Sequence, residues 1–105
     1  PPFTHLVFIE IKDRQDAKAR SVAEAAGGLM REAIHGKGEE GRLRLLGPMP
    51  ALLEKVRDEF RWSMLIRCLS TDGLAGVLHD FRRRCLNAKL PFLKIAIDVD
   101  PIEMS

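Results

Sequence analysis

The chain has 105 residues, of which 46% are hydrophobic and 30% are charged, and its formal net charge is +2. These values favour one soluble domain that buries roughly two thirds of its unfolded surface, and so small a net charge does not by itself indicate nucleic-acid binding. No apolar run approaches the ~18–20 residues that span a bilayer, and the first residues do not follow the pattern of a secretory signal.

The first part of the chain predicts a strand, a helix and a loop. Residues 5–11 are rich in β-branched and apolar side chains and predict a strand that is buried on both faces. Apolar residues at helical spacing predict a helix over residues 13–34, although Gly27 and Gly28 inside it each cost ~1 kcal/mol against Ala. The glycine-rich segment 35–41 predicts a loop.

The middle of the chain predicts two strands joined by an irregular connection. Residues 42–46 alternate and predict a half-exposed strand. We expect the stretch Gly47-Pro48-Met49-Pro50 to end this strand, because proline does not donate a ladder hydrogen bond. Residues 51–59 are expected to be a connector, with one helical turn at 51–56, and residues 60–68 predict the third strand.

The last part predicts a second helix over residues 74–85 and a final strand over residues 92–100. The predicted order of elements is therefore β-α-β-β-α-β. This order favours an α+β fold of the split βαβ, or ferredoxin-like, type, in which two helices cover one face of a four-stranded antiparallel sheet.

Alternation along the strands separates an apolar face from a basic one. If the apolar sides meet the helices, the open face of the sheet collects five basic residues: Arg42, Arg44, Arg61, Arg67 and Lys94. Such a surface binds phosphates, because each cation neutralises one phosphate and releases a counterion. A solvated face, or one that packs against another domain, explains the same pattern.

Two other features are candidate nucleic-acid contacts. Alternation places Trp62 opposite Arg61, so Trp62 is predicted to anchor the sheet to the helices, and no exposed aromatic residue is predicted on the open face for base stacking. A run of three arginines lies on the back of the second helix, where such runs are usually solvated but also suit a phosphate: Arg82, Arg83 and Arg84.

The sequence predicts no catalytic or metal site. Three histidines lie far from any nucleophile or carboxylate at motif spacing: His5, His35 and His79. Cys68 and Cys85 are expected to be reduced core residues, and Asp98 and Asp100 suit salt bridges with neighbouring arginines better than a metal ion. A glycine-rich loop of the phosphate-cradling type is absent.

Several motifs, taken in order, resemble one family. Gly47-Pro48-x-Pro50-Ala51 is followed by Arg61-Trp62 and, near the end, by Ile97-Asp98-Val99-Asp100-Pro101. With the opening Pro1-Pro2-Phe3-Thr4-His5-Leu6, they resemble the C-terminal domain of PriA, the primosomal replication-restart DNA helicase of bacteria, across essentially the whole chain. The chain also begins without Met, so we expect residues 1–105 to be a single C-terminal domain of a larger helicase protein.

The resemblance implies a fold similar to a small ribosomal protein of the S-ten type. It implies that the ATPase motifs, and with them ATP, magnesium and zinc, belong to other parts of the helicase, so that this domain is not itself an enzyme and holds no cofactor. It implies a bacterial, cytoplasmic, nucleoid-associated protein with no membrane role. The implied partners are forked and single-stranded DNA, single-stranded-DNA-binding protein and other primosome proteins, and the helicase lobes of the same chain.

Three functions are open from the sequence. The first is a DNA-binding accessory domain that recognises branched or single-stranded DNA at stalled forks, with the basic residues of the open face and of the second helix positioning phosphates. The second is a protein-interaction module that docks the helicase lobes or an acidic tail. The third is a ribosomal-like RNA-binding domain, which only fold-level similarity supports.

Overall fold

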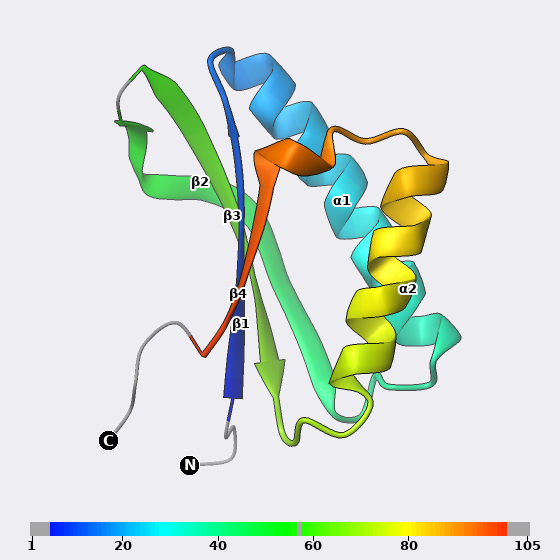
Figure 1. The fold of residues 1–105 in the computed structure, drawn as a ribbon. Coiled ribbons are helices and arrows are strands. Elements are labelled where there is room, and N and C mark those ends of the chain that lie inside the picture. Colours follow the sequence, from blue (N-terminus) through cyan, green and yellow to red (C-terminus); the bar gives the residue numbers. More distant parts are fainter. Residues whose placement is uncertain (1–4, 57, 101–105) are drawn as a thin grey trace.

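The structure, a computed structural model, describes residues 5–56 and 58–100, and its elements follow the predicted order (Figure 1). In chain order they are β1 His5–Asp13, α1 Asp16–Gly36, β2 Leu43–Val56, β3 Glu59–Cys68, α2 Leu74–Asn87, the 3-10 helix η1 Phe92–Lys94 and β4 Ile95–Val99. Neither helix in this part of the chain is long and apolar enough to cross a membrane.

The four strands form one antiparallel sheet in the order β2-β3-β1-β4. The central strands are thus β1 and β3, and β2 and β4 form the two edges. Both helices cover the same face of the sheet, and α1 contacts α2 (Figure 1). This arrangement confirms the predicted α+β, ferredoxin-like fold.

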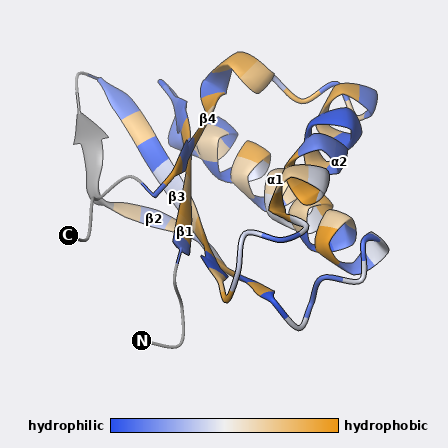
Figure 2. Cartoon of the chain, turned by 60° about the horizontal axis from the view of Figure 1, so that its bottom comes forward, coloured by the Kyte–Doolittle hydropathy of each residue, from blue (hydrophilic) through white to orange (hydrophobic). Residues whose placement is uncertain are grey.

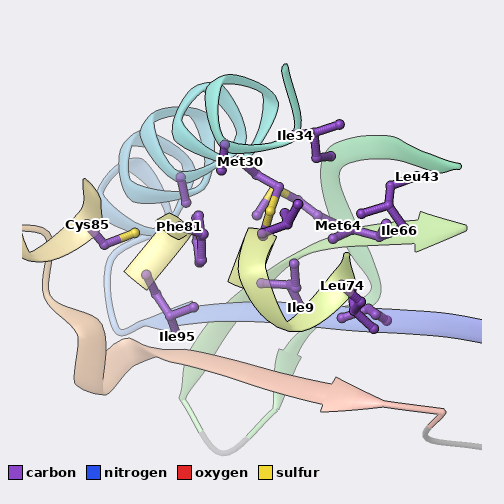
Figure 3. Packing of buried hydrophobic residues seen from close by; sticks show 14 of the residues in the cluster. Ile9, Met30, Ile34, Leu43, Met64, Ile66, Leu74, Phe81, Cys85 and Ile95 are labelled. Carbon is purple, nitrogen blue, oxygen red and sulfur yellow. The ribbon is translucent and has the colours of Figure 1, made fainter. Parts of the chain in front are cut away.

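The core lies between the helices and the sheet, where apolar residues recur along the facing sides of the strands and helices (Figure 2). Its largest fully buried side chains come from both helices and from the central strands β1 and β3: Phe81, Ile9, Ile11, Met30, Met64 and Ile66. Figure 3 shows that Phe81 projects from α2 into the space between the two layers, near Cys85 and Ile95. The helices are therefore attached to the sheet mainly by hydrophobic burial.

The two thiols belong to this core, as the sequence predicts. Cys68 of β3 and Cys85 of α2 are free and fully buried. Burial raises the pKa of the Cys85 thiol to about 11 and also raises the pKa of Cys68. Both groups are therefore thiols rather than thiolates at neutral pH, and a buried thiol is chemically inert.

The prediction that the first strand is buried on both faces is wrong. Val7, Ile9 and Ile11 face the helices and are fully buried. The alternate residues of β1 point to the open face and are only half-buried: Leu6, Phe8, Glu10 and Lys12. The helices cover only one side of the sheet, so the apolar residues at positions 6 and 8 remain accessible.

The prediction that Gly47–Pro50 ends the second strand is also wrong, as is the predicted connector at 51–59. Strand β2 runs through to Val56 with two irregularities in its pairing to β3, between Leu46 and Met49 and between Pro50 and Lys55. Proline is tolerated here because β2 is an edge strand, where a missing N–H need not interrupt the ladder. The peptide bond between Gly47 and Pro48 is cis.

Gly27, which lowers the helix propensity of α1, has a packing role. A Cβ atom at this position would lie 3.0 Å from Cδ of Pro48 and 3.4 Å from Sδ of Met64. The missing side chain lets α1 approach β2 and β3 closely. Gly28 has open space around its Cα and no such role.

The final strand is shorter than the predicted range 92–100. Residues Phe92–Lys94 form η1, and the Phe92 ring packs against the core with its centroid 6.5 Å from that of Phe81. An unbroken strand over residues 92–100 would place Leu93 on the same helix-facing side as Ile95, but Leu93 is fully exposed. The packing of Phe92 breaks the alternation that the sequence suggested, so Lys94 does not lie on a strand.

Candidate nucleic-acid interface

The open face of the sheet, which is the face turned away from the helices, has an apolar centre. In the strand register Phe8 lies opposite Leu65, and Leu65 lies opposite Leu46. These three half-buried residues form a continuous row across β1, β3 and β2, which we call the apolar row. The prediction that the open face offers no aromatic residue is therefore wrong, because Phe8 lies in its centre.

Two arginines flank the apolar row. Arg44 of β2 lies directly opposite Arg67 of β3, which in turn lies opposite Leu6 of β1, and both arginines are exposed. Like charges directly opposite each other on antiparallel strands destabilise the pairing. An anion beside Arg44 would offset this repulsion, and Arg44 has no ion-pair partner among the residues that the structure describes.

Arg61 lies on the open face as predicted, but its guanidinium already forms an ion pair with a carboxylate. Its Nη1 donates a hydrogen bond of 2.6 Å to Oε1 of Glu10 on the neighbouring strand. Only 23% of the Arg61 side chain and 24% of the Glu10 side chain are exposed. A phosphate would have to compete with Glu10, so Arg61 is a weaker anion contact than Arg44.

Arg42 and Lys94 lie at opposite ends of the sheet rather than on its face. Arg42 precedes β2, and its Nη2 donates a hydrogen bond of 2.6 Å to Oε1 of Glu39. Lys94 lies in η1 and donates from Nζ to the buried carboxylate of Asp13. The structure therefore does not bring the five predicted cations together on one surface.

The arginine run of α2 lies in the helical layer, away from the open face. Arg84 connects the helices, since its Nε lies 2.7 Å from Oδ2 of Asp80 and its Nη1 lies 3.7 Å from Oε1 of Glu32 on α1. Arg83 also donates to Asp80, whereas Arg82 is exposed. Arg84 thus has a structural role, and phosphate binding by this run stays a prediction.

The ion pairs of Asp80 predict a loss of stability in acid. Arg84, followed by Arg83, holds the pKa of this carboxyl below its ordinary value of 3.8. The lowered pKa means that the stabilising contribution of Asp80 is present above pH 3.8 and is lost as the pH falls through the pKa of the folded state. Lys94 and His5 lower the pKa values of Asp13 and Asp100 in the same direction.

Urea denaturation at several pH values from 7 down to below 3.8 measures this loss. We expect the Asp80→Asn variant to be less stable than the natural chain at neutral pH, because Arg83 and Arg84 lose their counter-charge. Its stability should also fall less steeply in acid, because one of the titrating groups is gone. If the free energy of unfolding fell with pH equally steeply in both proteins, Asp80 would not be the source of the acid destabilisation.

Trp62 faces the helices, on the side of β3 opposite Arg61, as the alternation predicts. Its ring packs against the core cluster, and Nε1 donates a hydrogen bond of 2.9 Å to Oδ1 of Asp16 at the start of α1. The guanidinium of Arg20 lies 6.0 Å from the ring centroid. Trp62 is only half-buried, so it joins the first turn of α1 to the sheet at the margin of the core.

Phe8 and Leu6 are the open-face residues that the sequence reasoning missed. Glu10 and Lys12 identify them, because these two polar residues share one side of β1 near its end. Side chains two residues apart in a strand lie on the same face, so positions 8 and 6 lie on that side as well. The apolar identity of these two residues on an accessible face is what makes the surface unusual.

The remaining candidates for metal or catalytic roles take part in local structure. His5 Nδ1 lies 2.7 Å from Oδ2 of Asp100, and Oδ1 of Asp100 accepts a hydrogen bond from the backbone N–H of Leu6. His35 Nδ1 lies 2.6 Å from Oε2 of Glu40. Within residues 5–56 and 58–100, no three His, Cys, Asp or Glu side chains are grouped to hold a metal ion.

Solved structures share the fold at low sequence identity. A de novo designed protein, Foldit4, aligns with a TM-score of 0.55 and 15% identity over 90% of this chain and 91% of its own. A putative aminohydrolase from methicillin-resistant Staphylococcus aureus aligns with a TM-score of 0.53 and 8% identity over 91% of this chain and 29% of its own. These similarities concern the fold alone.

Sequence relatives are more informative. The replication restart protein PriA of Haemophilus influenzae is 29% identical over 106 aligned positions, which cover 100% of this chain but 14% of that protein. The probable replication restart protein PriA of Deinococcus radiodurans is 29% identical over 96% of this chain and 10% of its own length. The family described as the primosomal protein N C-terminal domain matches residues 1–102. The chain therefore belongs to the family of PriA, or primosomal protein N, C-terminal domains.

Proposed function

We propose that this domain binds single-stranded DNA, including the single-stranded arms of forked DNA, on the open face of its sheet. The observation that carries the proposal is the position of the apolar row, with Phe8 in it, beside the paired arginines Arg44 and Arg67. Single strands bind to surfaces that combine a stacking platform for bases with cations for the phosphates. The domain would act as an accessory part of a replication restart helicase in the cytoplasm, with ATP hydrolysis in other parts of that protein.

The two groups of residues have different tasks in this proposal. Arg44 and Arg67 neutralise phosphates and so contribute affinity that falls with salt but does not depend on sequence. Phe8 offers its ring to a base, and Leu46 and Leu65 extend the apolar surface beside it. Binding of this kind selects for unpaired strands, because bases within a duplex are already stacked on each other.

A protein-docking function is the second candidate, and the apolar row also favours it. Half-exposed leucines on a sheet suit a protein contact, and the chain spans only 14% and 10% of the two relatives above. The occupant would then be another part of the parent protein, such as a helicase lobe, or a primosome partner. This candidate differs from DNA binding in what it requires of Phe8, which needs only to be apolar.

The test of the proposal is the affinity of the domain for a labelled single-stranded oligonucleotide, measured by fluorescence anisotropy. We expect Phe8→Leu to weaken binding by about tenfold, because stacking contributes about 1–3 kcal/mol per base and leucine has no ring to stack. Leucine keeps the site apolar, so the protein remains folded. An unchanged affinity in this variant would remove the stacking role and favour the protein-docking function.

Charge removal provides a matched comparison. Arg44→Gln should weaken binding by roughly tenfold, since a charge-assisted contact contributes about 1.5–3 kcal/mol. Lys37→Gln, which removes the same charge just after the end of α1, should leave the affinity within about twofold. Oligonucleotides of DNA and RNA with the same sequence, and a blunt DNA duplex, complete the set. Tighter binding to RNA or to the duplex would contradict the proposed preference for single-stranded DNA.

A further inference from the structure

A second positive surface lies at the end of the sheet that is farther from Arg44, where β1 meets α1 and η1 (upper part of Figure 1). A hollow of about 460 Å³ occurs there, which we call the β1–α1 hollow. Its charged lining consists of four cations and two carboxylates: Lys12, Arg14, Lys18, Lys94, Asp13 and Glu59. Of these residues only Lys94 is a predicted phosphate contact, and alternation placed it on the open face.

The positive charge of the hollow is only partly compensated. The buried Asp13 carboxylate accepts a hydrogen bond from Lys94 and thus compensates one of the four cations. Lys12, Arg14 and Lys18 form no ion pair with any residue that the structure describes. Glu59 is the second carboxylate of the lining, so the four cations and two carboxylates leave the hollow with a net charge of +2. Low-dielectric walls strengthen the field of this excess charge inside the hollow, and a bound anion would neutralise it.

Asp13 also fixes the shape of the hollow. Its Oδ1 accepts a hydrogen bond of 2.9 Å from the backbone N–H of Gln15, and its Oδ2 holds Lys94 of η1. The segment between β1 and α1 is thus tied to η1 by one buried carboxylate. An ammonium group has three donors, so Lys94 keeps donors for a ligand after bonding to Asp13. A site that is ordered before binding pays less entropy when the ligand arrives.

We propose that the β1–α1 hollow binds a phosphate group of the nucleic-acid strand that crosses the open face. This proposal rests on the proposed function and extends it to a second contact. Lys12 belongs to both surfaces, because it lies on the open face opposite Arg61 and also lines the hollow. The distance along β1 from Leu6, which lies beside Arg67, to Lys12 is about 20 Å, because a strand rises about 3.3–3.4 Å per residue.

The strand would therefore run along β1, from the arginine pair past Phe8 to the hollow. The arginine pair and the hollow would hold phosphates at its two ends, and Phe8 would contact a base between them. Leu93, which is fully exposed and lines the hollow, offers an apolar wall for a sugar or base next to the bound phosphate. A ligand too short to span both sites would lose one of the two phosphate contacts.

The test compares two double variants of equal net charge. Lys12→Gln/Lys18→Gln removes two cations of the hollow, and Lys37→Gln/Lys89→Gln removes two lysines that do not line it. Affinity for single-stranded DNA is measured across a salt series. We expect the first variant to bind at least about tenfold more weakly, with a plot of log K against log salt that is shallower by about 0.7 for each lost phosphate contact. The second variant should match the unsubstituted domain in slope.

Equal slopes and affinities for the two double variants would overturn the proposal. If the unsubstituted domain does not bind DNA at all, the proposed function fails, and titration with inorganic pyrophosphate decides the hollow separately. Shifts of backbone amide signals in residues 12–18 that disappear in Lys12→Gln/Lys18→Gln would still establish an anion site, and their absence would overturn it. Pyrophosphate binding as tight as DNA binding would overturn the assignment to a strand and indicate a free phosphate ligand.

Discussion

Replacing Phe81 with alanine is expected to destabilise the domain by about 3–5 kcal/mol. The Phe81 side chain projects from α2 into the centre of the core and is fully buried (Figure 3). Its ring centroid lies 6.5 Å from that of Phe92. Its removal forfeits the hydrophobic transfer free energy of the ring and leaves a cavity that helix and sheet fill only partly. Small domains have a total free energy of unfolding of about 5–15 kcal/mol, so this one substitution removes a large share of it.

Urea denaturation followed by the fluorescence of Trp62, the single tryptophan of the chain, measures this effect. The midpoint should move to lower urea with little change in slope. Leu86→Ala, on the same helix but 56% exposed, is the matched control and should change stability by less than about 0.5 kcal/mol. A loss of less than about 1 kcal/mol for Phe81→Ala would mean that α2 is not packed on the sheet as described.

Gly47→Ala is the second substitution with a large expected effect, roughly 2–5 kcal/mol of lost stability. Gly47 has φ +94°, a conformation that residues with a side chain rarely adopt. An added Cβ would lie 2.9 Å from the carbonyl oxygen of Ser63 on β3, which is backbone and moves only with the sheet. The Gly47 carbonyl also accepts a hydrogen bond of 2.7 Å from Nη2 of Arg31 on α1, so a shift of this segment disturbs the helix as well.

A second Gly→Ala substitution serves as a control, because it is expected to raise stability rather than lower it. Gly76 lies inside α2, and nothing would contact an added Cβ within 4 Å. Gly76→Ala should therefore raise stability by about 0.5–1 kcal/mol through helix propensity. Thermal or urea denaturation of both variants tests the pair. Equal effects of the two substitutions would show that the constraint at Gly47 is not the reason for its glycine.

The fold was predictable because each element carries its own local signal. Val7, Ile9 and Ile11 alternate in β1, and the apolar positions of both helices recur at helical spacing, so element types and order follow from the sequence. The extent of β2 did not follow, because the prolines at 48 and 50 forbid a central strand but not an edge strand. Which strand becomes an edge depends on the assembled sheet and is not a local property.

The candidate site was predictable only in part. Alternation correctly assigned Arg44, Arg61 and Trp62 to their faces, because those residues lie in regular strands. It did not predict that Glu10 binds Arg61 or that Asp13 binds Lys94, because these partners are distant in the sequence and meet only through strand pairing. Phe8 escaped prediction for a different reason, since the continuous apolar run of residues 5–11 is equally typical of a strand that is buried on both faces.

The central claim is that the open face of this domain binds the phosphates of a single strand. The most direct test is the affinity of the unsubstituted domain for a single-stranded oligonucleotide at a series of salt concentrations. Contacts from Arg44 and Arg67 alone predict that log K falls with log salt with a slope of about −1.4, at about −0.7 for each phosphate, and a steeper slope if the hollow contributes. Binding that does not change with salt, or no detectable binding at micromolar protein, would contradict the claim.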